Sequence, residues 1–462
     1  MRHIPVTCEQ REGMLRALGV ASPAELYADV PESARLGRPL ELPEAMSEIE
    51  LAAHLRVLAG HNDPAAACVT FAGGGVYDHY VPSVVEHVLR RPEFFTAYTP
   101  YQPEVSQGTL QAIFEYQTMV CELTGMDVAN ASMYDGATAL VEAALMACRV
   151  TRRSRVVCAP TVHPEWQRTL ATYAVAGDRE VDYSLAVDAA MGVCDPLDEA
   201  AGVQRLCEEG DVAAVLVQSP NFFGCMEDIR EMGRVAHEAG ALLVVAANPM
   251  LLGVLESPGA LGADIVVGEG QCFGNAMSFG GPGLGIFACR QEHVRQMPGR
   301  LVGRTVDADG RTAYVLTLST REQHIRREKA TSNICSNHAL NALAAGAYLA
   351  AVGTEGLAGI GRACIAKAHY LRERLVGTGR FEAAWDGPFA HEFALRYDGD
   401  VSGMLSAMFE RGYLAGVEVA GFAAEWPAGM PPVSDEGLVL LAVTEKRTRS
   451  EMDAFADEVA SL

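Results

Sequence analysis

The stretch 263–288, ADIVVGEGQCFGNAMSFGGPGLGIFA, decides the class of fold. Two short apolar runs, ADIVV and LGIFA, enclose a glycine-rich segment from Gly268 to Gly283. Runs of this length indicate buried strands, and the glycines indicate the loop that joins them. In many cofactor-dependent enzymes a loop of this kind, late in a parallel-sheet domain, carries a lysine, but this loop has none. The question is why the chain keeps the loop without the nucleophile.

Apolar runs alternate with amphipathic segments on the N-terminal side of this stretch. The runs are continuous, which is typical of strands that are buried on both faces, and the segments between them have helical spacing. The alternation predicts an α/β fold with a mostly parallel sheet. The candidate strands are 155–160, 213–219 and 241–247, and the candidate helices are 108–125, 136–149 and 226–240.

The chain is expected to have three parts. Capping-box patterns, in which a hydroxyl residue is followed three positions later by Glu or Gln, predict helices at Thr7–Gln10, Ser22–Glu25 and Ser47–Glu50. The parts are an N-terminal helical arm (1–64), a large α/β domain (65–330), and a connecting helix with a small C-terminal α/β domain (331–462).

Composition excludes several classes of protein. The net charge of −23 disfavours nucleic-acid binding, which needs basic surface. No apolar run approaches the roughly 20 residues of a membrane helix, and the N-terminus lacks the apolar region of a secretory signal. The 12 cysteines include no Cys-x-x-Cys pair, which indicates reduced thiols in the cytoplasm and predicts no metal site.

The chain has only three lysines, Lys329, Lys367 and Lys446. Arginine stays protonated and cannot form a Schiff base with an aldehyde cofactor. Any such chemistry on this chain must therefore use one of these three residues.

Two loops have residues suited to lining a pocket. Tyr98–Gly108 (YTPYQPEVSQG) is a proline-stiffened loop with two tyrosines, although a surface turn is an open alternative. Phe71–Pro82 (FAGGGVYDHYVP) has three glycines that permit close backbone approach. His79 in this loop could be an acid or base, but a lone histidine is more often structural.

Two further stretches lead into predicted helices. Asp135 stands at the turn before the helix at 136–149, where a carboxylate caps the helix and repels phosphate. In Arg326–Leu340, the segment Thr331, Ser332 and Asn333 could donate hydrogen bonds to an anion or simply precede a helix.

At these four stretches the chain resembles a known family. The matching motifs are YDHYVP (77–82), AYTPYQPEVSQG (97–108), ANASMYDGATA (129–139) and STREQHIRREKATSNIC (319–335). They are similar to the glycine cleavage system P-protein, and most of all to its alpha subunit (subunit 1) in organisms that divide the enzyme between two chains. The motifs are long, and the resemblance extends over nearly the whole chain.

The resemblance implies a fold, an activity and partners. The fold is that of the pyridoxal-phosphate (PLP) transferases of fold type I, the aspartate-aminotransferase-like group. The enzyme is an α2β2 assembly that decarboxylates glycine and passes the aminomethyl group to the lipoyl arm of the H-protein. The beta subunit carries the PLP and its lysine.

Three departures from the catalytic half of that family answer the opening question. Aligning the glycines and the phenylalanine of its Lys-Thr-Phe loop places Gln271 at the lysine position. Val245 or Ala246 stands where the family has an aspartate that keeps the ring nitrogen protonated. Asp135 lies at the phosphate turn. The chain is thus expected to be the subunit without covalent cofactor.

By analogy with fold-type relatives, whose sites lie across a dimer interface, loops of this chain should line the partner's active site. The expected contributors are Thr99, Tyr101, Glu104 and Gln107, together with Thr331, Ser332 and Asn333, of which Thr331 and Ser332 would contact the cofactor phosphate.

Two alternatives stay open. The chain could be an inert structural or regulatory subunit, although the polar loop at 99–108 argues against it. It could also be a stand-alone PLP decarboxylase that uses Lys329.

Overall fold

The structure is a computed structural model that describes residues 6–62, 68–95, 97–177, 179–208, 210–422 and 437–462. The chain forms two compact units, residues 1–63 and 64–462. The predicted division into three parts, with a boundary at residue 330, stays a prediction.

The first unit is helical, and its two α-helices begin at predicted capping boxes. The side chains of Thr7 and Ser47 each accept a hydrogen bond from the backbone three residues on. The box predicted at Ser22 is wrong, because this serine makes no side-chain cap bond. None of the described residues in this unit is buried. The helices are α1 (Cys8–Leu18), α2 (Glu48–Ala59) and the 3-10 turns Pro23–Tyr27 and Glu32–Ala34.

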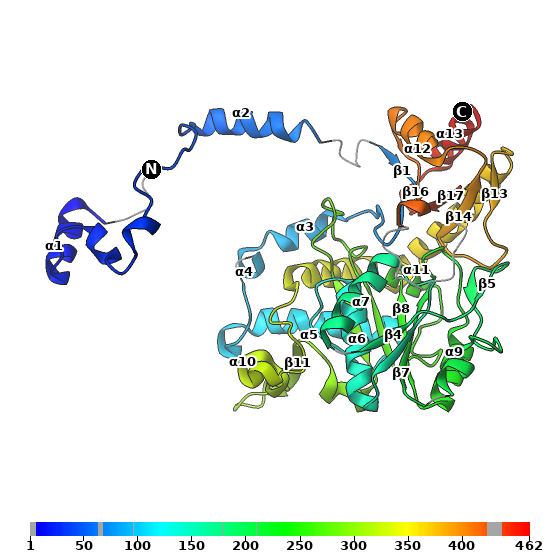
Figure 1. The fold of residues 1–462 in the computed structure, drawn as a ribbon, viewed down its shortest axis with the longest axis horizontal. Coiled ribbons are helices and arrows are strands. Elements are labelled where there is room, and N and C mark those ends of the chain that lie inside the picture. Colours follow the sequence, from blue (N-terminus) through cyan, green and yellow to red (C-terminus); the bar gives the residue numbers. More distant parts are fainter. Residues whose placement is uncertain (1–5, 63–67, 96, 178, 209, 423–436) are drawn as a thin grey trace. The chain divides into compact units, whose positions relative to one another are not determined.

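A seven-stranded sheet forms the centre of the second unit (Figure 1). Its order is β2-β10-β9-β8-β7-β3-β4, in which β9, β8, β7, β3 and β4 are parallel and β10 is antiparallel to both neighbours. The predicted strands all lie in this mostly parallel sheet. Its strands are β2 (Val128–Ala129), β3 (Arg155–Cys158), β4 (Glu180–Asp182), β7 (Val212–Ser219), β8 (Leu242–Ala247), β9 (Ile265–Glu269) and β10 (Gly285–Cys289).

Helices pack around this sheet and bury its continuous apolar strands. The three predicted helices correspond to α5, α6 and α9, and the capping role predicted for Asp135 is confirmed at α6. The helices up to the end of the sheet are α3 (Ser83–Leu89), α4 (Pro92–Phe95), α5 (Gln107–Thr124), α6 (Gly136–Thr151), α7 (Pro164–Gly177), α8 (Val203–Cys207) and α9 (Ile229–Glu238).

A second, antiparallel sheet has the order β13-β14-β17-β16 and its own apolar core with α12, α13 and part of α11. Three strand pairs lie outside the two large sheets: β1 with β15, β5 with β6, and β11 with β12. The remaining elements are β1 (Val69–Thr70), β5 (Val187–Asp188), β6 (Val193–Cys194), β11 (Leu301–Val306), β12 (Thr312–Thr317), α10 (Gln323–Arg326), α11 (Ala339–Val376), β13 (Phe381–Ala383), β14 (Glu392–Tyr397), α12 (Val401–Glu410), β15 (Tyr413–Leu414), β16 (Val417–Glu418), β17 (Leu438–Ala442) and α13 (Arg449–Ala460).

The long helix α11 is the predicted connecting helix. By length and composition it could cross a membrane, and it is the one described helix that could. It is interrupted at Gly353, whose φ of 61° lies outside the helical range, and it packs against α3, α5 and α13.

Candidate functional site

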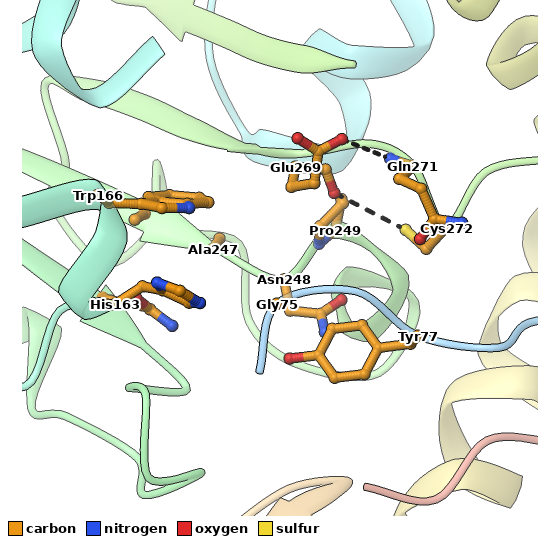
Figure 2. A pocket seen from close by; sticks show the side chains of 12 residues that line it. Gly75, Tyr77, His163, Trp166, Ala247, Asn248, Pro249, Glu269, Gln271 and Cys272 are labelled. Atoms are coloured by element: carbon orange, nitrogen blue, oxygen red, sulfur yellow. Dashed lines mark hydrogen bonds between the residues drawn. The ribbon is translucent and has the colours of Figure 1, made fainter. Parts of the chain in front are cut away.

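A small cavity lies at the carboxyl ends of β7, β8 and β9, where parallel α/β sheets bind their ligands (Figure 2). Its volume of about 40 Å³ is large enough to hold a water molecule. A wider hollow of about 310 Å³ shares part of its wall and reaches the loop Gly280–Gly283. The cavity is lined by Gly75, Tyr77, His163, Trp166, Gln218, Ala246, Ala247, Asn248, Pro249, Glu269, Gln271 and Cys272.

The register of β8 decides which of its residues faces this cavity. Leu243 approaches Gly233 of α9, so alternate residues of β8, including Val245, face the side of α9. Ala246 pairs with Gln218 and Val267 and faces the other side, together with Glu269. The methyl group of Ala246 thus lines the cavity, and β8 offers no carboxylate there.

Gln271 occupies the wall of the cavity and is 6% exposed. Its side-chain Nε2 donates to the carbonyl of Asn275 at 2.6 Å, which closes the start of the glycine-rich loop. All three lysines lie in the described part of the chain, and none lines the cavity. Lys329 is exposed, Lys367 donates to the carbonyl of Glu445, and Lys446 pairs with Asp78.

Carboxylates occupy the N-terminus of α6. Glu269 Oε2 accepts the N–H of Gly136 at 3.0 Å, and Asp135 Oδ1 accepts the N–H of Thr138 at 2.7 Å. Burial raises the pKa of Glu269, while its bonds from the N–H groups of Leu284, Gly136 and Gln271 oppose the rise. The helix donors that would bind a phosphate are therefore already used by the protein's own anions.

Aromatic rings fill the space next to this helix start. A Cβ at Gly136 would collide with the indole of Trp166, so the ring lies directly against the helix. His163 stacks beside Trp166 at 6.1 Å between ring centroids and donates from Nε2 to the carbonyl of Gly74 at 2.8 Å. Burial lowers the pKa of His163, so the ring is neutral at neutral pH.

The residues of the cavity do not fit PLP. The wall has no amine for the aldehyde, and Ala246 cannot hold a proton on a ring nitrogen. At the start of α6, where the phosphate is expected, Glu269 and Asp135 already accept the N–H groups of Gly136 and Thr138. The wider hollow has the same difficulty, because Asp135, Glu165 and Glu269 line it. An anionic cofactor would meet electrostatic repulsion in both spaces.

The structure brings the two loops expected at a partner's site together. Arg300, which is 6% exposed, donates to the hydroxyl of Tyr101 at 3.2 Å and to the carbonyl of Cys335 at 2.5 Å. Its guanidinium also lies 5.5 Å from the centroid of the Tyr101 ring, and Glu322 pairs with it at 3.6 Å. Both loops are therefore held by one buried cation.

The seven residues expected at the partner's site differ in their availability. Gln107 is engaged within the chain, since its amide both donates to and accepts from the backbone of Tyr314 at 2.9 Å. The hydroxyl of Ser332 donates to Glu142 at 2.7 Å. Glu104 and Asn333 are exposed, Tyr101 is 50% exposed, and Thr99 and Thr331 are half-buried.

Comparison with known proteins identifies the family of this chain. The family described as "Glycine cleavage system P-protein" matches residues 1–457. A relative from Chlorobium luteolum, named probable glycine dehydrogenase (decarboxylating) subunit 1, is 50% identical over 100% of both chains. This chain belongs to the glycine cleavage system P-protein family. The crystal structure of a glycine decarboxylase (P-protein) in inhibitor-bound form is 43% identical, covers 100% of both chains and has a TM-score of 0.88.

The P-protein chain has the PLP fold type I expected from its sequence. The glutamate decarboxylase of Lactobacillus brevis superimposes with a TM-score of 0.65 over 93% of this chain and 96% of that one, at 13% identity. Such low identity shows the shared fold alone. The predicted fold class is confirmed.

Sequence reasoning missed two features of this P-protein chain. Arg300 had no motif around it, and only the folded chain shows that it joins both loops. The sequence analysis assigned no role to Glu269. An acidic residue at the end of a buried strand needs hydrogen-bond partners, and this requirement could have indicated its contact with the start of α6.

Proposed function

We propose that this chain is subunit 1 of a two-chain glycine dehydrogenase (decarboxylating) and that it holds no PLP itself. The observation that carries the proposal is the cavity at the end of β8, whose wall has Gln271, Ala246 and Glu269 and no lysine, with Asp135 in the adjoining hollow at the start of α6. The partner, the beta subunit, then supplies the lysine and binds the cofactor. When bound there, PLP acts as the electron sink for loss of CO2 from glycine.

The contribution of this chain is to complete the partner's site. Arg300 fixes the Tyr101 loop and the 331–335 loop against each other before any partner arrives. A loop that is already ordered loses less conformational entropy when the subunits assemble than a flexible loop does. Tyr101, Glu104 and Asn333 are the exposed residues that best suit contact with the partner's substrate, and Thr99 and Thr331 support them.

Gln107 and Ser332 are proposed as supports of these loops. The amide of Gln107 fastens the start of α5 to β12, and Ser332 fastens its loop to Glu142 of α6. A contact from Ser332 to a phosphate in the partner would have to compete with this 2.7 Å bond to a buried carboxylate.

We propose that the N-terminal unit also contacts the partner. Its apolar side chains include Ile49 at 83% exposure, Leu42 at 72% and Leu40 at 65%. No described residue of this unit is fully buried, whereas packing of an apolar face is what normally stabilises short helices. An α2β2 assembly would provide that burial, and the lipoyl arm of the H-protein would enter where the unlike subunits meet.

Borohydride trapping tests the proposal. The chain alone and the chain co-expressed with a beta-type partner are incubated with PLP, reduced, digested and mapped by mass spectrometry. We expect the pyridoxyl label on a partner lysine only. Label on Lys329 would overturn the proposal in favour of a stand-alone PLP enzyme.

Activity of the separate chains tests the alternative of an inert subunit. We expect the partner alone to exchange glycine carboxyl with labelled bicarbonate far more slowly than the pair. Equal rates would favour a purely structural role for this chain.

A further inference from the structure

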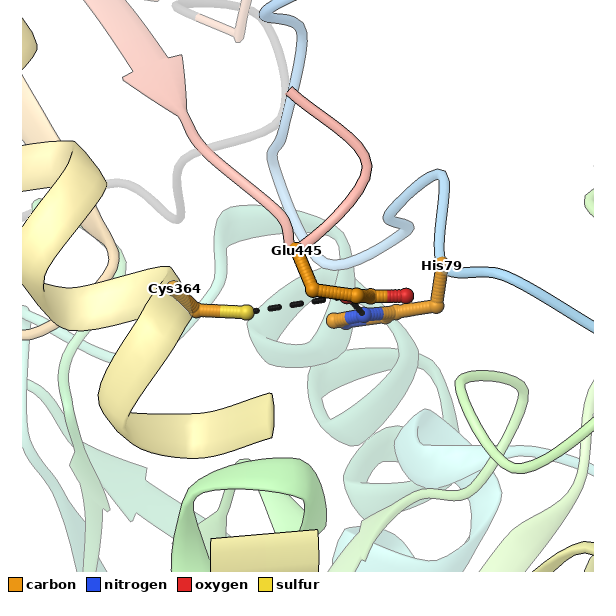
Figure 3. A group of neighbouring side chains, drawn as sticks. All are labelled: His79, Cys364 and Glu445. Atoms are coloured by element: carbon orange, nitrogen blue, oxygen red, sulfur yellow. Dashed lines mark hydrogen bonds and ion pairs between the residues drawn. The ribbon is translucent and has the colours of Figure 1, made fainter. Parts of the chain in front are cut away.

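Three side chains from distant parts of the second unit bring metal-binding atoms together (Figure 3). His79 precedes α3, Cys364 lies on α11, and Glu445 follows β17. One ligand atom from each lies within 4.8 Å of the others. The sequence predicted no metal site because these residues are far apart along the chain.

Two of the three residues are buried, and the side chain of Glu445 is 16% exposed. Cys364 is fully buried and His79 is 7% exposed. The Nδ1 of His79 contacts Glu445, while its Nε2 is buried without a hydrogen-bond partner among the residues that the structure describes. The other carboxylate oxygen of Glu445, Oε1, accepts a hydrogen bond from the N–H of Tyr80 at 2.6 Å, and this bond orients the carboxylate.

The distances suit a tetrahedral ion after a small adjustment. Zn²⁺ bound at about 2.0–2.3 Å by N, O and S holds its ligand atoms about 3.4–3.6 Å apart. Glu445 Oε2 lies 3.7 Å from the sulfur of Cys364 and 2.7 Å from Nδ1 of His79. To reach this spacing, the imidazole and the carboxylate would have to separate by about 0.7–0.9 Å, and the imidazole and the sulfur, which lie within 4.8 Å of each other, would have to adopt the same spacing.

The charges of the cluster match a divalent cation. Glu445 offers one negative charge as a carboxylate. A thiolate at Cys364 adds a second negative charge, so a bound Zn²⁺ would be neutralised within its own ligands.

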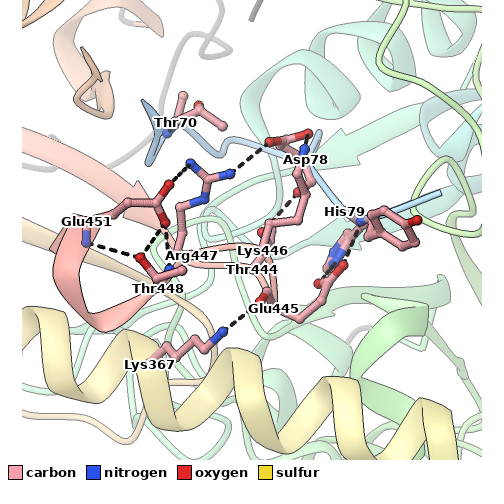
Figure 4. Close-up of polar contacts among 12 residues, drawn as sticks. Thr70, Asp78, His79, Lys367, Thr444, Glu445, Lys446, Arg447, Thr448 and Glu451 are labelled. Carbon is pink, nitrogen blue, oxygen red and sulfur yellow. Dashed lines mark hydrogen bonds and ion pairs between the residues drawn. The ribbon is translucent and has the colours of Figure 1, made fainter. Parts of the chain in front are cut away.

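Nearby cations have partners of their own (Figure 4). Lys446 and Arg447 pair with Asp78 at 2.6 and 3.5 Å, and Lys367 donates to the backbone carbonyl of Glu445. Burial lowers the pKa of the neighbouring His391 to about 3, so that ring is neutral.

We propose that His79, Cys364 and Glu445 bind a zinc ion. Nδ1 of His79, which faces Glu445, gives up its proton and coordinates the metal, and the imidazole then carries its one ring proton on Nε2. The thiol proton of Cys364 leaves to solvent as the Zn–S bond forms, and water or another ligand completes the tetrahedron. The site joins the loop before α3 to α11 and to the chain after β17, so binding stabilises the folded unit.

Metal analysis of the full chain tests this site. The chain is produced in cells grown with added zinc, dialysed and measured by inductively coupled plasma mass spectrometry. We expect about one zinc per chain. Cys364→Ser should weaken zinc binding by at least the roughly 10- to 100-fold that loss of an outer partner costs.

Cobalt substitution gives a spectroscopic test of whether the sulfur of Cys364 binds the metal, which a merely structural role of Cys364 would not produce. Chain produced with Co²⁺ should show a thiolate-to-cobalt charge-transfer band that is absent in Cys364→Ser. The matched control is Cys225→Ser, a buried cysteine outside the cluster, which should keep both the metal and the band. Wild-type chain without stoichiometric metal, or a band that survives Cys364→Ser, would overturn the proposal. If Cys364→Ser does not fold, the zinc content of the wild-type chain still tests the proposal.

Discussion

The substitution Glu392→Gln offers a quantitative test of the buried carboxyl that holds the Gly73–Gly75 segment. Glu392, on β14, is 4% exposed and accepts the N–H of Gly74 at 2.6 Å and the hydroxyl of Tyr77 at 2.7 Å. Burial raises the pKa of Glu392 from 4.5 to about 7, although these two bonds oppose the rise. The folded chain therefore binds the proton more tightly than the unfolded chain does.

The sign and size of the effect follow from this difference. The stabilisation is fully present below pH 4.5 and is lost as the pH rises to about 7. At about 1.4 kcal/mol for each tenfold change in the dissociation constant, the full loss is about 3 kcal/mol. Glutamine cannot ionise and resembles the protonated acid in shape. Between about pH 5 and about pH 8, the variant should gain about 2–3 kcal/mol in unfolding free energy relative to wild type.

Denaturant titration at these two pH values measures the difference. Comparing the variant with wild type at each pH cancels other titrating groups, including Glu227, whose pKa burial also raises to about 7. Glu382→Gln, an exposed residue on the adjacent strand β13, is the control and should show a difference that does not change with pH. A Glu392→Gln difference that is equally flat would refute the reasoning.

Three further predictions concern the cavity and the loops. Gln271→Lys should not form an imine with PLP in the isolated chain, because the phosphate position stays occupied; an imine absorbance would contradict this. Arg300→Ala should lower glycine decarboxylation by the assembled enzyme and cost about 1–3 kcal/mol in stability, since the Tyr101 hydroxyl and the Cys335 carbonyl lose a charged donor; unchanged kinetics would remove the positioning role. Asp135→Ala should cost about 1 kcal/mol in thermal denaturation through loss of the α6 cap, and an unchanged midpoint would show that the cap contributes nothing.

Some features of the structure could be predicted from the local sequence. The apolar runs at 213–219, 241–247, 263–267 and 284–288 could be read as buried strands because every residue of such a strand must avoid water on both faces. Asp135 could be read as a cap because capping depends on neighbours within one turn. The same reasoning failed at Ser22, where a 3-10 turn forms without the side-chain bond.

Long-range contacts could not be read in this way. Nothing local to Gln107 or Ser332 shows that the side chains are engaged by β12 and α6, and nothing local to Arg300 shows that it links two loops. The choice between Val245 and Ala246 for the cavity wall also needed the register of β8 against its neighbours. A shift of one residue exchanges the two faces of a strand.

The sequence by itself determined the fold class, the positions of the main strands and helices, and the absence of lysine from the glycine-rich loop, because these depend on residue type and short spacing. The tertiary structure alone decided which carboxylates occupy the start of α6, which loop residues stay exposed, and that His79, Cys364 and Glu445 meet. These features depend on side chains distant in the chain, and only the packing of the elements brings such side chains within bonding distance.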